Sequence, residues 1–98
     1  MGPVSATATI ITHNEAEQIA ACVESVSFFA EVLVIDSGST DDTVTRARAA
    51  GARVMSHAWP GFGLQKQFAV DQASHDWVFS IDADERVSAA LRDTIEAL

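Results

Sequence analysis

Residues 32–40 read VLVIDSGST, and this stretch decides the fold class of the chain. Its four apolar residues form a continuous run, which is typical of a strand buried on both faces of a parallel sheet. Asp36 ends the run, and loop-forming residues follow it. A helix is expected next, ending near Ala50, because Gly51 is a favoured residue just past a helix end. The stretch therefore predicts a strand, a loop and a helix in that order.

The same unit recurs on both sides of this stretch. β-Branched or apolar runs predict further strands at residues 6–11, 53–56 and 77–81, and helical spacing predicts helices over 15–27, 64–73 and from Ser88 onward. Asn14 with Glu17, and Ser39 with Asp42, have the spacing of helix N-caps. Strand and helix thus alternate four times, which predicts an α/β fold: a Rossmann-like, mainly parallel sheet with helices on both faces.

Composition limits the function classes. The chain has 98 residues, 48% of them hydrophobic and 20% charged, which fits one folded domain over residues 1–98. Its net charge of −8, without a basic stripe, argues against nucleic-acid binding. Cys22 is the one cysteine, so the fold does not depend on an intrachain disulfide. No secretion signal and no apolar run of roughly 18 residues is visible, so a cytoplasmic location is expected.

Polar clusters follow the first, second and fourth predicted strands, at residues 12–15, 36–41 and 82–85. In open parallel sheets, ligands bind at the carboxyl ends of the strands, and these ends meet at one edge. The three clusters are therefore expected to lie close together and to form a binding site.

Asp82 and Asp84 are separated by one residue at the end of a strand, so both can direct oxygens toward one point. Mg²⁺ and Mn²⁺ prefer oxygen ligands and often share a site with phosphates. A cation there could stabilise a diphosphate leaving group. From the spacing alone, a second interpretation stays open, in which Asp82 and Glu85 only cap a turn.

The loop after the second strand has two readings as well. Gly38 permits a tight backbone, the following helix presents free N–H groups, and Asp36 could accept a hydrogen bond from a base or a ribose. The alternative is a well-capped turn that uses Ser39 and Asp42 for capping.

Histidines and aromatic residues receive more modest roles. His13 is expected to be a rim or stacking residue rather than a catalytic base, and His57 and His75 are expected to have structural roles. Trp59, Trp77 and Phe79 are expected to anchor the core or loops. For Trp59, a role as a platform for a sugar stays open as well.

Taken together, three segments resemble the family 2 glycosyltransferases of the GT-A fold. They are residues 12–15 (THNE), 35–43 (IDSGSTDDT) and 77–85 (WVFSIDADE). The likeness is closer to bacterial members that build the lipopolysaccharide core, and it covers about residues 6–98. Three motifs in this order and spacing are far more specific than any one of them.

The resemblance implies a nucleotide-diphosphate sugar as ligand, most readily a UDP-sugar, together with Mn²⁺ or Mg²⁺. It implies inverting transfer to a saccharide or lipid-linked acceptor, in the cytoplasm or at the periphery of the inner membrane. The implied metal ligand is Asp84, with Asp82 facing the ribose or binding the metal through water. The other implied nucleotide-binding residues are Thr12, Asn14 and Glu15 in the nucleoside pocket, Asp36, Gly38 and Ser39 around the base, and Lys66 and Gln67 near the nucleotide.

The members of this family continue into an acceptor-binding half, which holds the general base. That base is expected beyond Leu98, so no catalytic residue is assigned, and the 98 residues alone are expected to be inactive and to self-associate. Two alternatives are a nucleotide-binding module without chemistry and a nucleotidyltransferase, although the latter usually has a glycine-rich loop after the first strand. A phosphotransfer domain fits less well, because its acidic residues would follow the first strand rather than the fourth.

Overall fold

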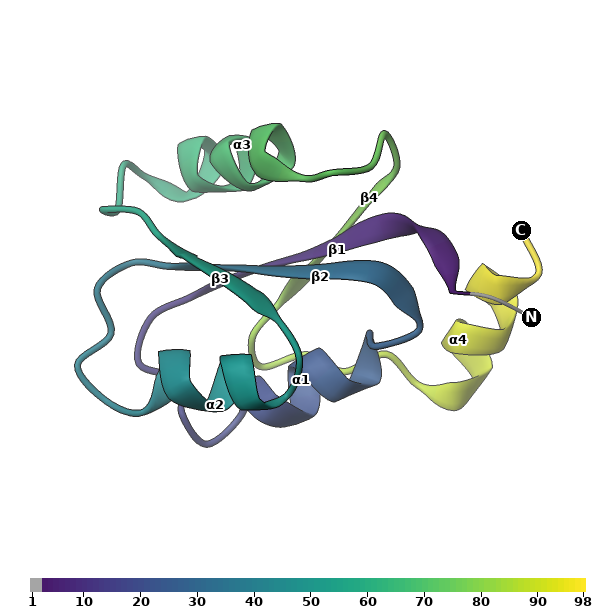
Figure 1. The fold of residues 1–98 in the computed structure, drawn as a ribbon, viewed down its shortest axis with the longest axis horizontal. Coiled ribbons are helices and arrows are strands. Elements are labelled where there is room, and N and C mark those ends of the chain that lie inside the picture. The colour runs from purple at the N-terminus through teal and green to yellow at the C-terminus, as the bar shows by residue number, and fades with distance from the viewer. Residues whose placement is uncertain (1–2) are drawn as a thin grey trace.

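The computed structural model describes residues 3–98, in which strands and helices alternate along the chain (Figure 1). The strands are β1 (Val4–Thr12), β2 (Phe29–Asp36), β3 (Arg53–Ser56) and β4 (Val78–Asp82). The helices are α1 (Ile19–Ser25), α2 (Thr43–Ala49), α3 (Phe62–Gln72) and α4 (Ala89–Glu96). The strands form one sheet in the order β3-β2-β1-β4, and each neighbouring pair is parallel. The predicted α/β fold is confirmed.

The register of the sheet brings the predicted clusters together. Thr12 at the end of β1 lies opposite Asp36 at the end of β2. On the other side of β1, Ile11 lies opposite Asp82 at the end of β4. The prediction that the polar clusters share the carboxyl edge is therefore confirmed.

Helices cover both faces of the sheet, with α1 and α2 on one face and α3 on the other (Figure 1). The larger core cluster lies between the sheet, α1 and α2, and includes Ile10, Val34 and Ile19. The smaller cluster under α3 includes Leu33 and Ala69. Because successive side chains of a strand point to opposite faces, a stretch covered on both sides must be apolar on both, as residues 32–35 of β2 are.

Two predicted helix starts are wrong. The first helix begins at Ile19 rather than near residue 15, and Gln18 at its N-cap makes no side-chain capping bond. Asn14 has a φ of 52°, in the left-handed region, so it belongs to the loop instead. The second helix begins at Thr43, and Asp42 at its N-cap also makes no side-chain capping bond. The expected cap residues, Asn14 and Ser39, instead bond to each other: the Asn14 N–H donates to the Ser39 hydroxyl.

The predicted helix stop and the last cap are confirmed. Gly51 follows α2 with a φ of 107°, which favours glycine. The Ser88 hydroxyl accepts a hydrogen bond from the N–H of Leu91 at 3.1 Å and caps α4. The expectation that Trp77 anchors the core or a loop is wrong, because 78% of its surface is exposed.

A polar cluster ties three strands to the loop before β4. The Glu31 carboxylate accepts hydrogen bonds from the Thr7 hydroxyl at 2.8 Å and from the Ser74 N–H at 2.9 Å, and its ion pair with Arg53 spans 3.2 Å. Burial acts to raise the pKa of Glu31, but the hydrogen bonds and the nearby Arg53 outweigh it and lower the pKa to about 2. His75 donates from Nδ1 to the Thr7 hydroxyl, at 3.0 Å, because that hydroxyl already donates to Glu31.

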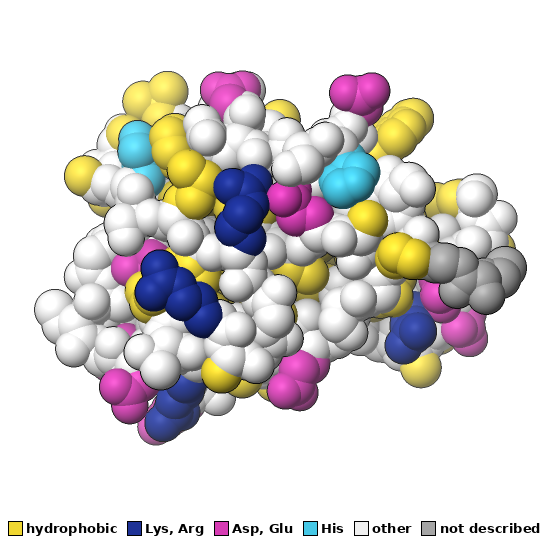
Figure 2. Space-filling model, in the orientation of Figure 1, with side chains coloured by type: hydrophobic (Ala, Val, Ile, Leu, Met, Phe, Trp, Pro, Cys, Tyr) yellow, Lys and Arg dark blue, Asp and Glu magenta, His cyan; other side chains and the backbone are white. Residues whose placement is uncertain are grey.

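Two global expectations concern the surface. On the face displayed in Figure 2, acidic side chains lie among the few Lys and Arg side chains. Within residues 3–98, no helix is long and apolar enough to cross a membrane.

Candidate functional site

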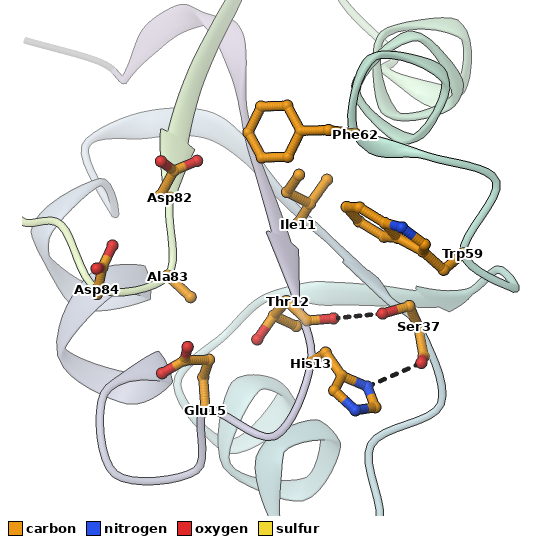
Figure 3. Close-up of a pocket in the computed structure, with 10 residues that line it drawn as sticks. All are labelled: Ile11, Thr12, His13, Glu15, Ser37, Trp59, Phe62, Asp82, Ala83 and Asp84. Carbon is orange, nitrogen blue, oxygen red and sulfur yellow. Dashed lines mark hydrogen bonds between the residues drawn. The ribbon is translucent and has the colours of Figure 1, made fainter.

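A pocket of about 550 Å³ lies at the carboxyl edge of the sheet, a size suited to a small-molecule ligand (Figure 3). Residues at the end of β1, after β2, in the loop between β3 and α3, and in the turn after β4 all contribute to it. The lining residues are Ile11, Thr12, His13, Glu15, Ser37, Trp59, Phe62, Asp82, Ala83 and Asp84.

One side of the pocket is acidic. Figure 3 shows the carboxylates of Asp82, Asp84 and Glu15 on the side opposite Trp59. The turn that carries the first two is closed by Glu85, whose carboxylate accepts from the Asp82 N–H at 2.9 Å and whose N–H donates to the Asp82 carbonyl at 2.9 Å. Within residues 3–98, no hydrogen bond occupies the carboxylate of Asp82 or Asp84. Glu85 therefore caps the turn, and the two aspartates stay free to bind a ligand.

The turn is also fastened to α1 from behind. The Cys22 thiol donates to the Asp82 carbonyl at 3.4 Å, and the Val87 N–H donates to the Ser25 hydroxyl at 3.1 Å. Burial raises the pKa of the Cys22 thiol to about 11, so it stays protonated at neutral pH. This cysteine is a structural residue, which agrees with its place in the core.

Thr12 carries the one buried side-chain oxygen or nitrogen within residues 3–98 that has no hydrogen-bond partner. Its residue is only 6% exposed, and its backbone carbonyl accepts from the Ser37 N–H at 3.1 Å and the Ser37 hydroxyl at 3.3 Å. In Figure 3 the Thr12 hydroxyl points away from Ser37, toward the side of Glu15. Buried polar groups are nearly always paired, so the missing partner of this hydroxyl, in a residue that lines the pocket, needs an explanation, and a bound ligand is one.

Two loops are joined next to the pocket, the loop after β1 and the loop after β2. The Asn14 N–H donates to the Ser39 hydroxyl at 2.8 Å, and the Asn14 side-chain oxygen accepts from the Thr40 N–H at 2.8 Å. Asp36 is 2% exposed, and both its carboxylate oxygens accept from Ser39, one of them from the N–H at 2.9 Å. These residues hold the loops together but do not line the pocket, so the nucleotide contacts implied for Asn14, Asp36, Gly38 and Ser39 stay predictions.

A second set of bonds fixes the backbone at Glu15. Its N–H donates to the Thr43 hydroxyl at 2.9 Å, and that hydroxyl donates to Asp41. The hydrogen bond from Thr43 lowers the pKa of Asp41. His13 lines the exposed rim, as expected, and donates from Nδ1 to the Ser37 carbonyl at 2.9 Å. Both loops are thus bonded to each other before any ligand arrives.

Lys66 and Gln67 lie on α3 and are not part of the lining. Gln67 donates to Asp71 at 2.8 Å, and the Lys66 ammonium lies 4.6 Å from the centre of the Phe62 ring. Their contacts with a nucleotide stay predictions. Sequence reasoning did not place Phe62 in the site and left Trp59 open between an anchor and a platform. His57 bonds to Gln65 at 2.7 Å, which supports its expected structural role.

The family model for glycosyl transferase family 2 matches residues 7–98. The chain belongs to this family. Among curated relatives, the lipopolysaccharide core biosynthesis glycosyltransferase LpsC of Rhizobium meliloti is 44% identical over 96 residues, which are 93% of this chain and 36% of that protein. An uncharacterized glycosyltransferase of Rickettsia felis is 49% identical over 90 residues, 91% of this chain and 32% of that protein. The chain spans about a third of the length of the curated relatives it matches.

Solved structures agree with this family 2 assignment. Glucosyl-3-phosphoglycerate synthase of Mycobacterium tuberculosis, in complex with Mn²⁺, UDP and glucosyl-3-phosphoglycerate, matches with a TM-score of 0.72 and 33% identity over 82% of this chain and 33% of that one. The same enzyme with Mg²⁺ and UDP matches with a TM-score of 0.78 and 32% identity, over 93% of this chain and 37% of that one. The expected GT-A fold is therefore confirmed.

Proposed function

We propose that this family 2 chain is the nucleotide-sugar-binding part of a glycosyltransferase that transfers a sugar, with inversion, from a nucleoside diphosphate to an acceptor hydroxyl. The observation that carries the proposal is one shared pocket, which is lined by Asp82 and Asp84, the acidic pair after β4, and by Thr12 with its unpartnered hydroxyl. The structures of the Mycobacterium tuberculosis enzyme with UDP and Mn²⁺ or Mg²⁺ support UDP and a divalent cation as ligands.

The donor set suits Mn²⁺ or Mg²⁺. Asp84 would bind the cation, and Asp82 would bind it directly or through water, since both carboxylates line the pocket. Within residues 3–98 no group of three or more His, Cys, Asp or Glu side chains could hold a metal ion. The protein would therefore supply one or two carboxylates and the diphosphate the rest, a usual arrangement for Mg²⁺. A cation held there supplies charge stabilisation for the diphosphate leaving group.

The other residues of the pocket bind and orient the nucleotide. The Thr12 hydroxyl would complete its hydrogen bonding on the ligand, and Glu15 is held in place by its backbone bond to Thr43. The relative in lipopolysaccharide core biosynthesis supports a saccharide or lipid-linked acceptor, and with it a cytoplasmic place at the periphery of the inner membrane.

Titration calorimetry with UDP tests the proposal. We expect binding that requires Mn²⁺ and is lost on chelation, and in Asp84→Asn we expect Mn²⁺ to make no difference. Asp93→Asn is the matched control, because Asp93 is exposed on α4 and lies outside the pocket lining. Equal UDP affinity with and without chelator, in the wild type and in Asp84→Asn alike, would refute the metal role. Absence of UDP binding under all conditions would refute the proposed function.

A further inference from the structure

We infer that Trp59 and Phe62 form an aromatic wall that stacks on the base of the nucleotide, with Trp59 on the side of the pocket opposite Asp82 and Asp84 (Figure 3). This inference rests on the proposed function and extends it, because it assigns a base-binding surface to two aromatic residues of the pocket lining.

The first observation is the exposure of two large aromatic rings at one place. Trp59 and Phe62 are each 54% exposed, and their ring centroids are 6.2 Å apart in an edge-to-face arrangement. Both line the pocket. Single exposed apolar side chains are common, but adjacent aromatic rings in the wall of a concave pocket indicate a surface that a ligand covers.

The second observation is that the wall is anchored before a ligand binds. The loop that carries Trp59 begins at His57, whose Nδ1 and carbonyl contact the Gln65 side chain at 2.7 and 3.1 Å. Gln65 is fully buried on α3, and Phe62 is the first residue of that helix. The Lys66 ammonium packs over the Phe62 ring at 4.6 Å. Since both ends of the loop are tied to α3, little ordering entropy is lost when the rings meet a planar ligand.

The order of the strands indicates which part of the ligand meets the wall. Trp59 follows β3 and the acidic pair follows β4, and these are the two outer strands of the sheet. With strands about 4.8 Å apart, three spacings separate them by roughly 14 Å, across which Thr12 and Ser37 lie. A nucleotide sugar carries its nucleoside and its sugar on opposite sides of the diphosphate. A diphosphate held at the acidic pair can therefore extend its nucleoside across the strand ends toward Trp59.

A planar base suits such a wall because every base has a π-face, and stacking on an aromatic side chain contributes to affinity whatever the base. The indole of Trp59 offers the larger surface, and Phe62 supports its edge. The inference therefore predicts that removal of the indole weakens binding of the whole nucleotide but not of the diphosphate alone.

Calorimetry with three probes in Mn²⁺ separates the roles: UDP, UDP-glucose and pyrophosphate. We expect Trp59→Ala to bind UDP and UDP-glucose about tenfold or more weakly and pyrophosphate as the wild type does. Trp59→Phe keeps an aromatic face and should recover most of the affinity. Trp77→Ala is the matched control, because Trp77 is exposed but precedes β4, outside the lining of the site, and should bind all three probes normally.

A fluorescence titration with UDP and Mg²⁺ shows which tryptophan lies next to the bound nucleotide. In Trp77→Phe the remaining indole is Trp59, and its emission should change as UDP binds, whereas in Trp59→Phe the emission of Trp77 should stay constant. A loss confined to UDP-glucose would assign the wall to the sugar and overturn the inference. An unchanged UDP affinity in Trp59→Ala, or an equal loss of pyrophosphate binding, would also overturn it while the proposed function stands. If the wild type binds no UDP, the proposed function fails and the inference with it.

Discussion

Thr12→Val should make the protein more stable and its nucleotide binding weaker. The Thr12 hydroxyl is buried without a hydrogen-bond partner among the described residues, and valine has nearly the same shape with a methyl group in place of that hydroxyl. If a ligand pairs with this hydroxyl, the free protein carries the desolvation cost of the unpaired group, and the complex gains a hydrogen bond.

The size of both effects follows from the burial. Leaving a buried hydroxyl unpaired costs about 1–3 kcal/mol, and a buried methyl group contributes about 0.8 kcal/mol. Because the strand end relaxes in part, we expect about 1 kcal/mol of added unfolding free energy, which raises the Tm by about 4–8 °C in a domain of this size. A net hydrogen bond of about 1 kcal/mol to the ligand corresponds to a roughly fivefold loss of UDP affinity.

Thermal unfolding followed by circular dichroism measures the first effect, and calorimetry with UDP and Mn²⁺ measures the second. Thr7→Val is the matched control on the same strand, because the Thr7 hydroxyl is fully buried but bonded to Glu31 at 2.8 Å and to His75 at 3.0 Å. That variant loses satisfied bonds and should be destabilised by about 1–3 kcal/mol, with UDP affinity unchanged.

Two results would refute the reasoning. A Tm that falls in Thr12→Val as it does in Thr7→Val would show that the hydroxyl is already satisfied in the free protein. A raised Tm with unchanged UDP affinity would show that the unpaired hydroxyl is a cost of folding rather than a group kept for the ligand.

Two further predictions concern stability at low pH and association. The folded pKa of Glu31, about 2, lies below its ordinary value of 4.5, so its contribution is present above pH 4.5 and is lost as the pH falls toward 2. In urea unfolding, Glu31→Gln should therefore lose less stability than the wild type as the pH falls over that range. Glu24→Gln, at an exposed position, is the control and should lose as much as the wild type. If the unfolding free energies of all three proteins fell in parallel with pH, this prediction would be contradicted. Trp77 and Leu98 line an apolar groove beside β4, and the outer edge of β4 is unpaired in the described sheet. Exposed apolar surface and an open strand edge both favour association, so we expect the 98-residue chain to self-associate. Trp77→Lys should weaken that association. Light scattering that shows a monomer at ~100 μM, where a micromolar contact would already form, would exclude it.

Local patterns along the chain were enough to predict the strands, the parallel sheet and the edge where the site lies. The run at residues 32–35 requires a strand covered on both faces, and such strands occur in parallel sheets with helices on both sides. The stop at Gly51 and the cap at Ser88 depend on neighbouring residues only, so these were readable too. The acidic pair could be placed at the ligand edge because the carboxyl ends of parallel strands always meet there.

The tertiary structure decided which side chains are free to act. Asn14 and Ser39 have the spacing of helix caps, yet they bond to each other's loops, because β1 and β2 are neighbours and bring loops 25 residues apart in sequence into contact. Whether the Thr12 hydroxyl has a partner, and whether Trp59 faces a pocket, depend in the same way on the order β3-β2-β1-β4. Strand order results from packing the whole chain, and no local propensity encodes it, so the aromatic wall and the unpaired hydroxyl became visible only in the folded molecule.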